Sequence, residues 1–228
     1  MALIKKFIKK TLFYIFGYQH SINWEKRVKD LGINSVYNDS TPKFERTSQT
    51  LAQNARYSIF LSEVFSDLNH GCRILDYGCG WGRHLELLKK TSGSTQIVGY
   101  DPFGDLFDNV IDGYSEKITS PELLMTLPKF DMVFIHLVIG GFNDKKLRDE
   151  FELIRSVIKN NGYIFLVEAC GDNEKKDSSW KIRKPETYFS LARDFKWNIK
   201  DIINESGDDL YIIVGKRMFK SEIKKCPG

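Results

Sequence analysis

From residue 55 to near the end of the chain, continuous apolar runs alternate with segments in which apolar residues recur every three or four positions. Short apolar runs rich in β-branched and aromatic residues predict strands, whereas apolar residues three and four positions apart predict helices. The predicted strands cover 73–78, 95–101, 130–140, 163–169, 195–205 and 208–217. The predicted helices cover 55–68, 82–91, 106–114 and 145–162.

Alternation of strands and helices at this spacing predicts an α/β fold, in which helices cover both faces of a mostly parallel sheet. The last two predicted strands, 195–205 and 208–217, follow the last predicted helix. We expect this closing pair to add an antiparallel strand to the sheet. A length of 228 residues suits one domain with short appendages. We expect the core at 55–228 and an N-terminal lid or acceptor segment at 21–54.

The pattern of residues 1–20 predicts a separate basic amphipathic helix ahead of the core. Four lysines face away from apolar residues at helical spacing, and no acidic residue occurs among them. The segment is too short and too charged to span a bilayer, and it lacks the cleavage site of a secretory signal. Two interpretations remain open: residues 1–16 lie on an anionic membrane surface, or the helix packs on the domain or on a partner.

Charge and cysteine content narrow the class of protein. The four lysines of the first helix account for the whole net charge of +4, so the rest of the chain carries no basic excess. A nucleic-acid partner is therefore not expected. The four cysteines are far apart and form no C-x-x-C pair, which argues against a zinc site and against a disulfide framework. We expect a protein of the reducing cytoplasm, either free or at the inner membrane face, without a metal.

The run "RILDYGCGWGRH" at 73–84 predicts a strand that enters a glycine-rich turn and then a helix. A dinucleotide site needs G-x-G-x-x-G, but Arg83 stands where the third glycine is required. The P-loop pattern G-x-x-x-x-G-K-[ST] is absent as well. Asp76 at the end of this strand suits an ammonium group, and Asp101 at the end of the next strand suits the two hydroxyls of a ribose. These features indicate a pocket for S-adenosylmethionine.

The motifs "ILDYGCGWGRHLELL", "IVGYDPF", "FDMVFIHLVIGGF" and "IRSVIKNNGYIFLVE" occur in an order that resembles the class I S-adenosylmethionine-dependent methyltransferases, over about residues 55–216. The resemblance implies a Rossmann-like sheet of seven strands whose last strand is antiparallel, with an N-terminal helical lid. It implies that Asp101 binds the ribose and that Ser120 stands where the family often has an acid near the adenine. The cofactor-binding residues that it implies are Asp76, Gly78, Cys79, Gly80, Gly82, Asp101, Pro102, Phe103, Ser120 and His136.

Two side chains are candidates for a general base in methyl transfer. His136 lies at the end of the fourth predicted strand, and Glu168 lies at the end of the fifth. The alternatives are that His136 packs in the core or contacts the cofactor, and that Glu168 binds a lid residue. Similar methyltransferases sometimes carry a histidine further along, where this chain has Gly141. A phosphate oxygen as acceptor would need no base.

A second resemblance concerns the segments on either side of the core motifs. The pattern W-x-x-R…LG…S-V-Y and the later "SSWKIRKPETY" are similar to a bacterial subgroup that includes methyltransferases of surface-polysaccharide assembly, some of which methylate a glycan phosphate. The substrate-binding candidates are Trp24, Arg27, Tyr37, Arg46, Gln53, Trp180 and Arg183.

These patterns predict methyl transfer to a hydroxyl or phosphate oxygen of a sugar or surface-polysaccharide precursor. Oxygen is favoured over nitrogen because the signature [DNS]-P-P-[YFW] is absent from the fourth strand. The alternatives are a diffusible metabolite such as a quinone or secondary-metabolite precursor, and a catalytically silent partner subunit that binds the cofactor.

Overall fold

A computed structural model describes residues 24–31, 46–68, 71–104, 113–172, 180–205 and 208–219. The first predicted helix, the candidate Tyr37 and most of the predicted helix at 106–114 lie outside these ranges. The side chains of Trp24 and Arg46 lie outside the description too. Among the described residues no helix combines the length and the apolar character needed to cross a membrane.

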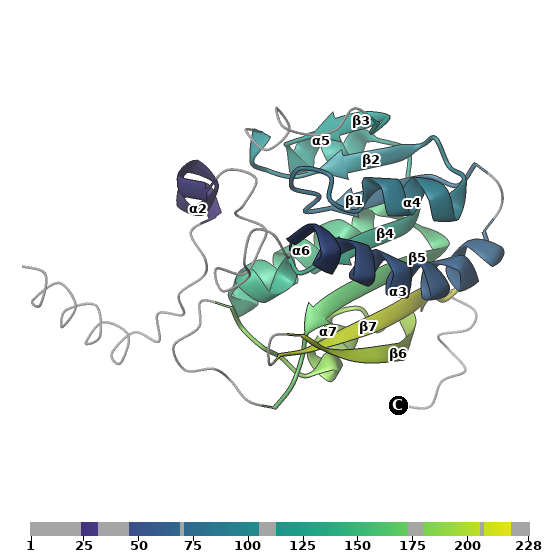
Figure 1. Ribbon diagram of the computed structural model, residues 1–228. Helices are drawn as coiled ribbons and strands as arrows, with labels where there is room; N and C mark the ends of the chain where they lie inside the picture. Colours follow the sequence, from purple (N-terminus) through teal and green to yellow (C-terminus); the bar gives the residue numbers. More distant parts are fainter. Residues whose placement is uncertain are drawn as a thin grey trace, which may run out of the picture.

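The centre of the molecule is one sheet of seven strands in the order β3-β2-β1-β4-β5-β7-β6 (Figure 1). All neighbours pair in parallel except β7, which is antiparallel to both β5 and β6. This arrangement confirms the predicted mostly parallel sheet with an antiparallel last strand. The strands are β1 (Ile74–Tyr77), β2 (Ile97–Tyr100), β3 (Glu116–Ile118), β4 (Phe130–His136), β5 (Ile158–Ala169), β6 (Phe195–Glu205) and β7 (Asp208–Arg217).

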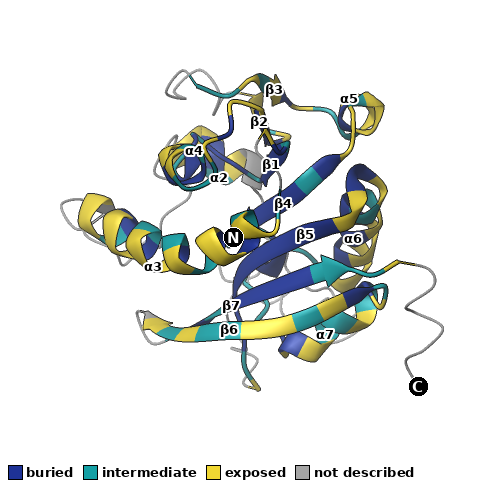
Figure 2. Ribbon diagram, turned by 90° about the vertical axis from the view of Figure 1, so that its right-hand side faces the viewer, coloured by how far each residue is buried: buried dark blue, intermediate teal, exposed yellow. Residues whose placement is uncertain are grey.

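Helices cover both faces of the sheet, as Figure 2 shows with the sheet seen between them. On one side lie α3 (Arg46–Ser66) and α4 (Leu85–Ser92), and on the other lie α5 (Pro121–Thr126), α6 (Asp144–Val157) and α7 (Pro185–Leu191). Alternate residues of β1 enter the two cores, with Ile74 on the α3 side and Leu75 on the α6 side. Every residue of β1 and β2 is therefore buried, which explains why these strands read as continuous apolar runs.

Three boundaries differ from the predictions. Helix α3 begins at Arg46, well before the expected Ala55, because its first turns are polar and give no apolar periodicity. Helix α6 ends at Val157, and Ile158 already pairs with β4. Strand β4 ends at His136, where the chain turns into the short 3₁₀ helix η4 (Ile139–Gly141).

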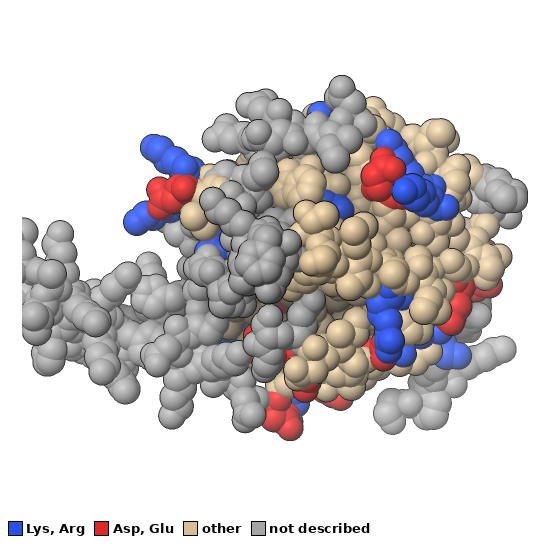
Figure 3. Space-filling model, viewed as in Figure 1, with Lys and Arg blue, Asp and Glu red and all other residues tan. Residues whose placement is uncertain are grey.

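The carboxyl ends of the parallel strands point toward the side where α2 (Trp24–Leu31) lies in Figure 1. In open α/β sheets, ligands bind at this edge. On the described surface seen in Figure 3, basic and acidic side chains are interspersed and do not gather into one patch. Several of them pair between α3 and the edge of the sheet, for example Arg56 with Asp201 and Lys200 with Glu63.

Candidate functional site

The glycine loop follows β1 at the carboxyl edge of the sheet. Gly78, Gly80 and Gly82 have φ values of 70°, 54° and 85°, which side chains other than glycine rarely adopt. The loop is anchored to the end of β2, because the N–H groups of Gly78 and Cys79 both donate to the carbonyl of Tyr100, at 2.7 and 3.1 Å. These two bonds fix the start of the loop to the neighbouring strand.

Gly78 also lies against the element that follows β4. A Cβ atom at this position would be 2.4 Å from a methyl carbon of Val138, closer than real contacts allow. Glycine is thus required here both by the positive φ and by the close approach of the two segments.

Asp101 follows β2 and fixes the glycine loop from the other side. Its Oδ2 accepts from the N–H of Gly80 at 3.0 Å, and its Oδ1 accepts from the N–H of Phe103 at 3.0 Å. The side chain is only 6% exposed, and burial raises the pKa of Asp101 to about 6 against the opposing effect of these two bonds. Each carboxylate oxygen retains a lone pair for a further donor such as a hydroxyl.

Asp76 in β1 is the second acid at this edge and is 3% exposed. Burial raises its pKa to about 7, a hydrogen bond from the hydroxyl of Tyr114 opposes the rise, and the nearby Asp101 adds to it. Two buried acids therefore stand on either side of one glycine loop. Such a pair suits a ligand that brings a positive charge and hydroxyl groups.

His136 ends β4 and contacts helix α3. Its Nε2 lies 3.1 Å from the hydroxyl of Tyr57, which is fully buried in α3. The ring of His84 is close as well, with centroids 4.3 Å apart, and His84 Nδ1 lies 2.7 Å from Asn54 Oδ1. Burial, together with the positive charge of Arg83, holds the pKa of His136 well below its ordinary value. His136 is accordingly a neutral and weakly basic imidazole.

Arg83 joins the glycine loop to the first half of α3. It donates to the Thr50 hydroxyl at 3.1 Å and to the side-chain oxygen of Gln53. Gln53, a predicted substrate-binding residue, is 5% exposed and faces the loop. Its contact with an acceptor stays a prediction.

Glu168 ends β5 and is fully buried. Its carboxylate accepts three hydrogen bonds of 3.0 to 3.1 Å, from the N–H groups of Gly140 and Ala169 and from the indole of Trp180. Burial raises the pKa of Glu168 to about 7, although all three donors favour the ionised form. The bond from Trp180 corresponds to the alternative in which Glu168 holds a lid residue.

Arg183 is 5% exposed and is bound internally. It pairs with Asp144 at the start of α6, and it donates to the carbonyls of Ile139 and Phe142 around η4. This set of partners gives Arg183 a structural role in joining the segment after β5 to η4. Binding of an acceptor by Trp180 or Arg183 remains a prediction.

The remaining candidates lie around the same edge. Ser120 caps α5 by accepting from the N–H of Leu123 at 3.2 Å, and it donates to Glu122 at 2.6 Å. Pro102 is exposed and Phe103 is half-buried beside Asp101. Arg27 lies on α2, which is separate from the sheet in Figure 1, on the side of the carboxyl ends of the parallel strands.

Several residues of this site carried no signal in the sequence. The Tyr57 hydroxyl meets His136 across 79 positions of the chain, and the Tyr114 hydroxyl meets Asp76 across 38. Only the folded sheet brings these groups together, so residue spacing could not reveal them. No group of three His, Cys, Asp or Glu side chains within the described ranges could hold a metal ion.

The sheet order and the glycine loop define a class I methyltransferase. A family model described as "Methyltransferase domain" matches residues 45–198, and the chain belongs to this family. The cofactor of this methyltransferase family is S-adenosylmethionine, and structural neighbours are described with S-adenosylmethionine or its product bound.

Similar proteins include phosphoethanolamine N-methyltransferase 1 of Triticum aestivum, 26% identical over 187 residues, with 75% of this chain and 35% of that protein covered. The enzyme of the same name from Arabidopsis thaliana is 28% identical over 141 residues, with 54% and 28% covered. The chain thus spans about a third of the length of these relatives.

Two solved structures illustrate the shared fold. A SAM-dependent methyltransferase from Archaeoglobus fulgidus has a TM-score of 0.58 at 22% identity, covering 76% of this chain and 98% of that one. Magnesium protoporphyrin IX methyltransferase from Synechocystis PCC 6803 with bound SAH has a TM-score of 0.61 at 13% identity, covering 93% and 99%.

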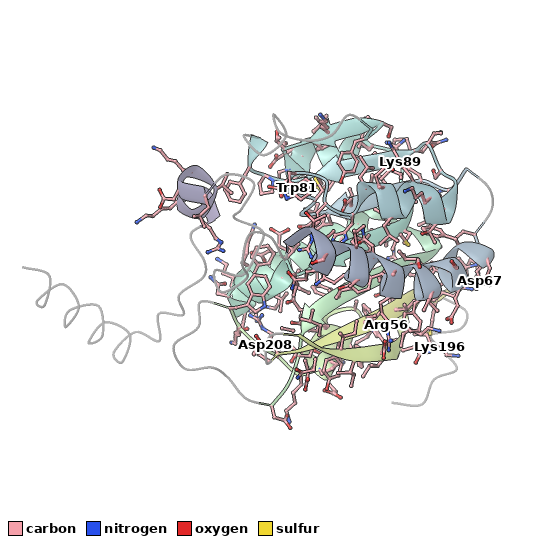
Figure 4. The ribbon with its side chains drawn as sticks, in the orientation of Figure 1. Arg56, Asp67, Trp81, Lys89, Lys196 and Asp208 are labelled. Carbon is pink, nitrogen blue, oxygen red and sulfur yellow. The ribbon has the colours of Figure 1, made fainter. Side chains whose placement is uncertain are left out.

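The residues at the carboxyl edge fit this cofactor. Three glycines with positive φ form the loop, and buried acids stand at the two strand ends beside it. Trp81 in the loop has a buried indole nitrogen without a hydrogen-bond partner among the described residues, and in Figure 4 it lies on the side toward α2. S-adenosylmethionine supplies an electrophilic methyl group on a sulfonium centre, and an acceptor takes it by in-line displacement. We assign binding of the amino-acid end to the glycine loop and Asp76, and binding of the ribose hydroxyls to Asp101.

Proposed function

We propose that this protein methylates a small acceptor that carries a phosphate group. One observation of the site carries the proposal: both candidate bases are committed to internal hydrogen bonds. His136 is paired with Tyr57, and Glu168 is surrounded by three donors. A neutral sugar hydroxyl needs a base to become nucleophilic, whereas an anionic phosphate oxygen does not. An acceptor that is nucleophilic by itself therefore suits the site best.

Within this class, methyl transfer to a phosphate oxygen of a sugar or surface-polysaccharide precursor is the candidate that the sequence favours. The segments around 24–37 and 178–188, with their tryptophan and arginine residues, support it. Arginine and aromatic groups suit a phosphorylated sugar. The absence of the [DNS]-P-P-[YFW] signature from the end of β4 favours oxygen as well.

The relatives support a second candidate, in which the methyl group goes to the amine of a small phosphate-bearing metabolite. They are named phosphoethanolamine N-methyltransferases, and the match covers 75% of this chain in the wheat protein. Both candidates share the phosphate group, and they differ in the atom that receives the methyl.

A matched panel of acceptors tests the proposal. The purified full chain is incubated with S-adenosylmethionine labelled in its methyl group and with pairs of acceptors that differ only by a phosphate: phosphoethanolamine and ethanolamine, glucose 1-phosphate and glucose. We expect label in the phosphorylated member of at least one pair, at a rate at least about tenfold above its partner, because a phosphate contact contributes more than a neutral one. Mass spectrometry of the product then identifies oxygen or nitrogen as the methylated atom.

Equal transfer to both members of each pair, or transfer only to a phenol or a quinone precursor, would contradict the proposal. Tight binding of the cofactor without transfer to any acceptor would instead favour the silent partner subunit.

A further inference from the structure

A tyrosine on the α4 side of the sheet contacts the acid that precedes the glycine loop. Tyr114 precedes β3, is half-buried, and packs with the apolar residues between α4 and the sheet. Its hydroxyl donates to Oδ2 of Asp76 at 2.5 Å. No motif of the sequence pointed to this residue.

The space for the tyrosine ring is made by a glycine of the neighbouring strand. Asp76 of β1 and Gly99 of β2 are partners in the parallel register. A Cβ atom at Gly99 would be 3.1 Å from the Tyr114 ring and 3.1 Å from Cys79 Sγ, tighter than most real contacts. The absent side chain at Gly99 therefore leaves room for the ring, whose hydroxyl reaches Asp76.

Three titratable groups face the Asp76 carboxylate. Tyr114 donates to it, Cys79 lies in the loop above, and Asp101 lies across the site at the end of β2. Burial raises the pKa of Tyr114 and of Cys79 well above their ordinary values, and the Asp76 carboxylate adds to the rise in both, so both are neutral. Tyr114 is consequently a permanent donor, and Asp101 is the only other source of charge within this set.

We propose that Tyr114 is a positioning residue for the cofactor: it fixes one oxygen of Asp76, turns the other toward the cofactor's ammonium group, and favours the ionised carboxylate that this ammonium requires. The inference concerns cofactor binding alone and does not depend on the acceptor.

The pH dependence follows from the ionisation of Asp76. Its pKa in the folded protein is about 7, so the fraction of ionised Asp76 rises with pH through neutrality. Removal of the tyrosine hydroxyl takes away the bond that lowers this pKa, and the pKa then rises further. Cofactor binding should therefore weaken most on the acid side of neutrality and recover as the pH increases.

Tyr114→Phe tests the proposal, because it keeps the ring and removes only the hydroxyl. We expect the Kd of S-adenosylhomocysteine, which carries the same amino-acid end, to increase roughly tenfold near pH 6.5 and less than about twofold near pH 8.5, as the loss of one hydrogen bond to a charged group implies. Isothermal titration calorimetry at the two pH values measures both ratios.

Tyr163→Phe is the matched control. The Tyr163 hydroxyl donates to Asp67 Oδ2 at 2.6 Å, and Figure 4 shows Asp67 at the far end of α3 from Trp81. This variant removes an equivalent bond and should leave the Kd unchanged at both pH values. Gly99→Ala is a second test, because its new Cβ would displace the Tyr114 ring from Asp76. We expect the same pH-dependent increase in Kd as in Tyr114→Phe.

An unchanged Kd in Tyr114→Phe at both pH values would overturn the proposal. A loss of equal size at both pH values would overturn it too, because a purely structural role predicts no dependence on the ionisation of Asp76. Thermal melting of each variant shows whether the fold is intact. The assay contains no acceptor, so its outcome is separate from that of the acceptor panel.

Discussion

Asp101→Asn is expected to weaken the binding of S-adenosylhomocysteine by at least about 100-fold. The carboxylate accepts from the N–H groups of Gly80 and Phe103, one with each oxygen. An asparagine presents one oxygen and one NH₂ group, so one of these donors would face another donor. Hydrogen bonds to a charged group contribute about 1.5–3 kcal/mol each, so the loss of one bond from the loop and one from a ribose hydroxyl corresponds to a factor of at least about 100. The glycine loop would be weakened at Gly80 while the ribose would lose an acceptor.

Calorimetric titration of the wild type and the variant with S-adenosylhomocysteine measures the effect. Asp172→Asn is the control, since Asp172 is exposed and forms an ion pair with Lys184 at the surface. It should bind the ligand as the wild type does. A near-normal affinity of Asp101→Asn would refute the assignment of the ribose to this acid.

Gly78→Ala is expected to destabilise the protein by about 2–5 kcal/mol and to abolish measurable cofactor binding. A left-handed backbone conformation costs a residue other than glycine about 1–2 kcal/mol. The new methyl group would also meet Val138 at 2.4 Å, and overpacking of this kind costs about 1–3 kcal/mol more. Relief of the clash requires the loop to move away from η4, which displaces the backbone that cradles the cofactor.

Urea denaturation and calorimetry measure stability and cofactor binding in Gly78→Ala. The same measurements on Gly93→Ala separate the cost of the left-handed backbone from the cost of the clash with Val138. Gly93 ends α4 with a φ of 64°, and no atom lies within 4 Å of its added Cβ. It should lose only the backbone contribution, about 1–2 kcal/mol. If both variants lost the same free energy of unfolding and both bound the cofactor normally, the close packing of Gly78 on Val138 would have no functional meaning.

The core of the fold was predictable from the sequence because its central strands are buried on both faces. Buried parallel strands read as short apolar runs, and the residues of β1 and β2 are buried at every position. The closing pair was predicted to the residue, at 195–205 and 208–217. Strand β3 is short and partly charged, and α7 has seven residues, so neither produced a recognisable period.

The cofactor edge was predictable for a related reason: an acid directly after an apolar run lies at the end of a strand. Asp76 and Asp101 stand where this rule places them. The polar contacts of α3 were not predictable, because Thr50, Gln53 and Tyr57 meet residues of the loop and of β4 that are distant in sequence. The rule also says nothing of the three donors that surround Glu168.

A crystal structure of the full chain with S-adenosylhomocysteine tests the central claim most directly. We expect the amino-acid end of the ligand to lie over the glycine loop with its ammonium group at Asp76. We expect both ribose hydroxyls within hydrogen-bond distance of Asp101, and the sulfur directed toward the side where α2 lies. Ribose hydroxyls bound by another residue, or a ligand bound away from the carboxyl edge of β1 and β2, would contradict it.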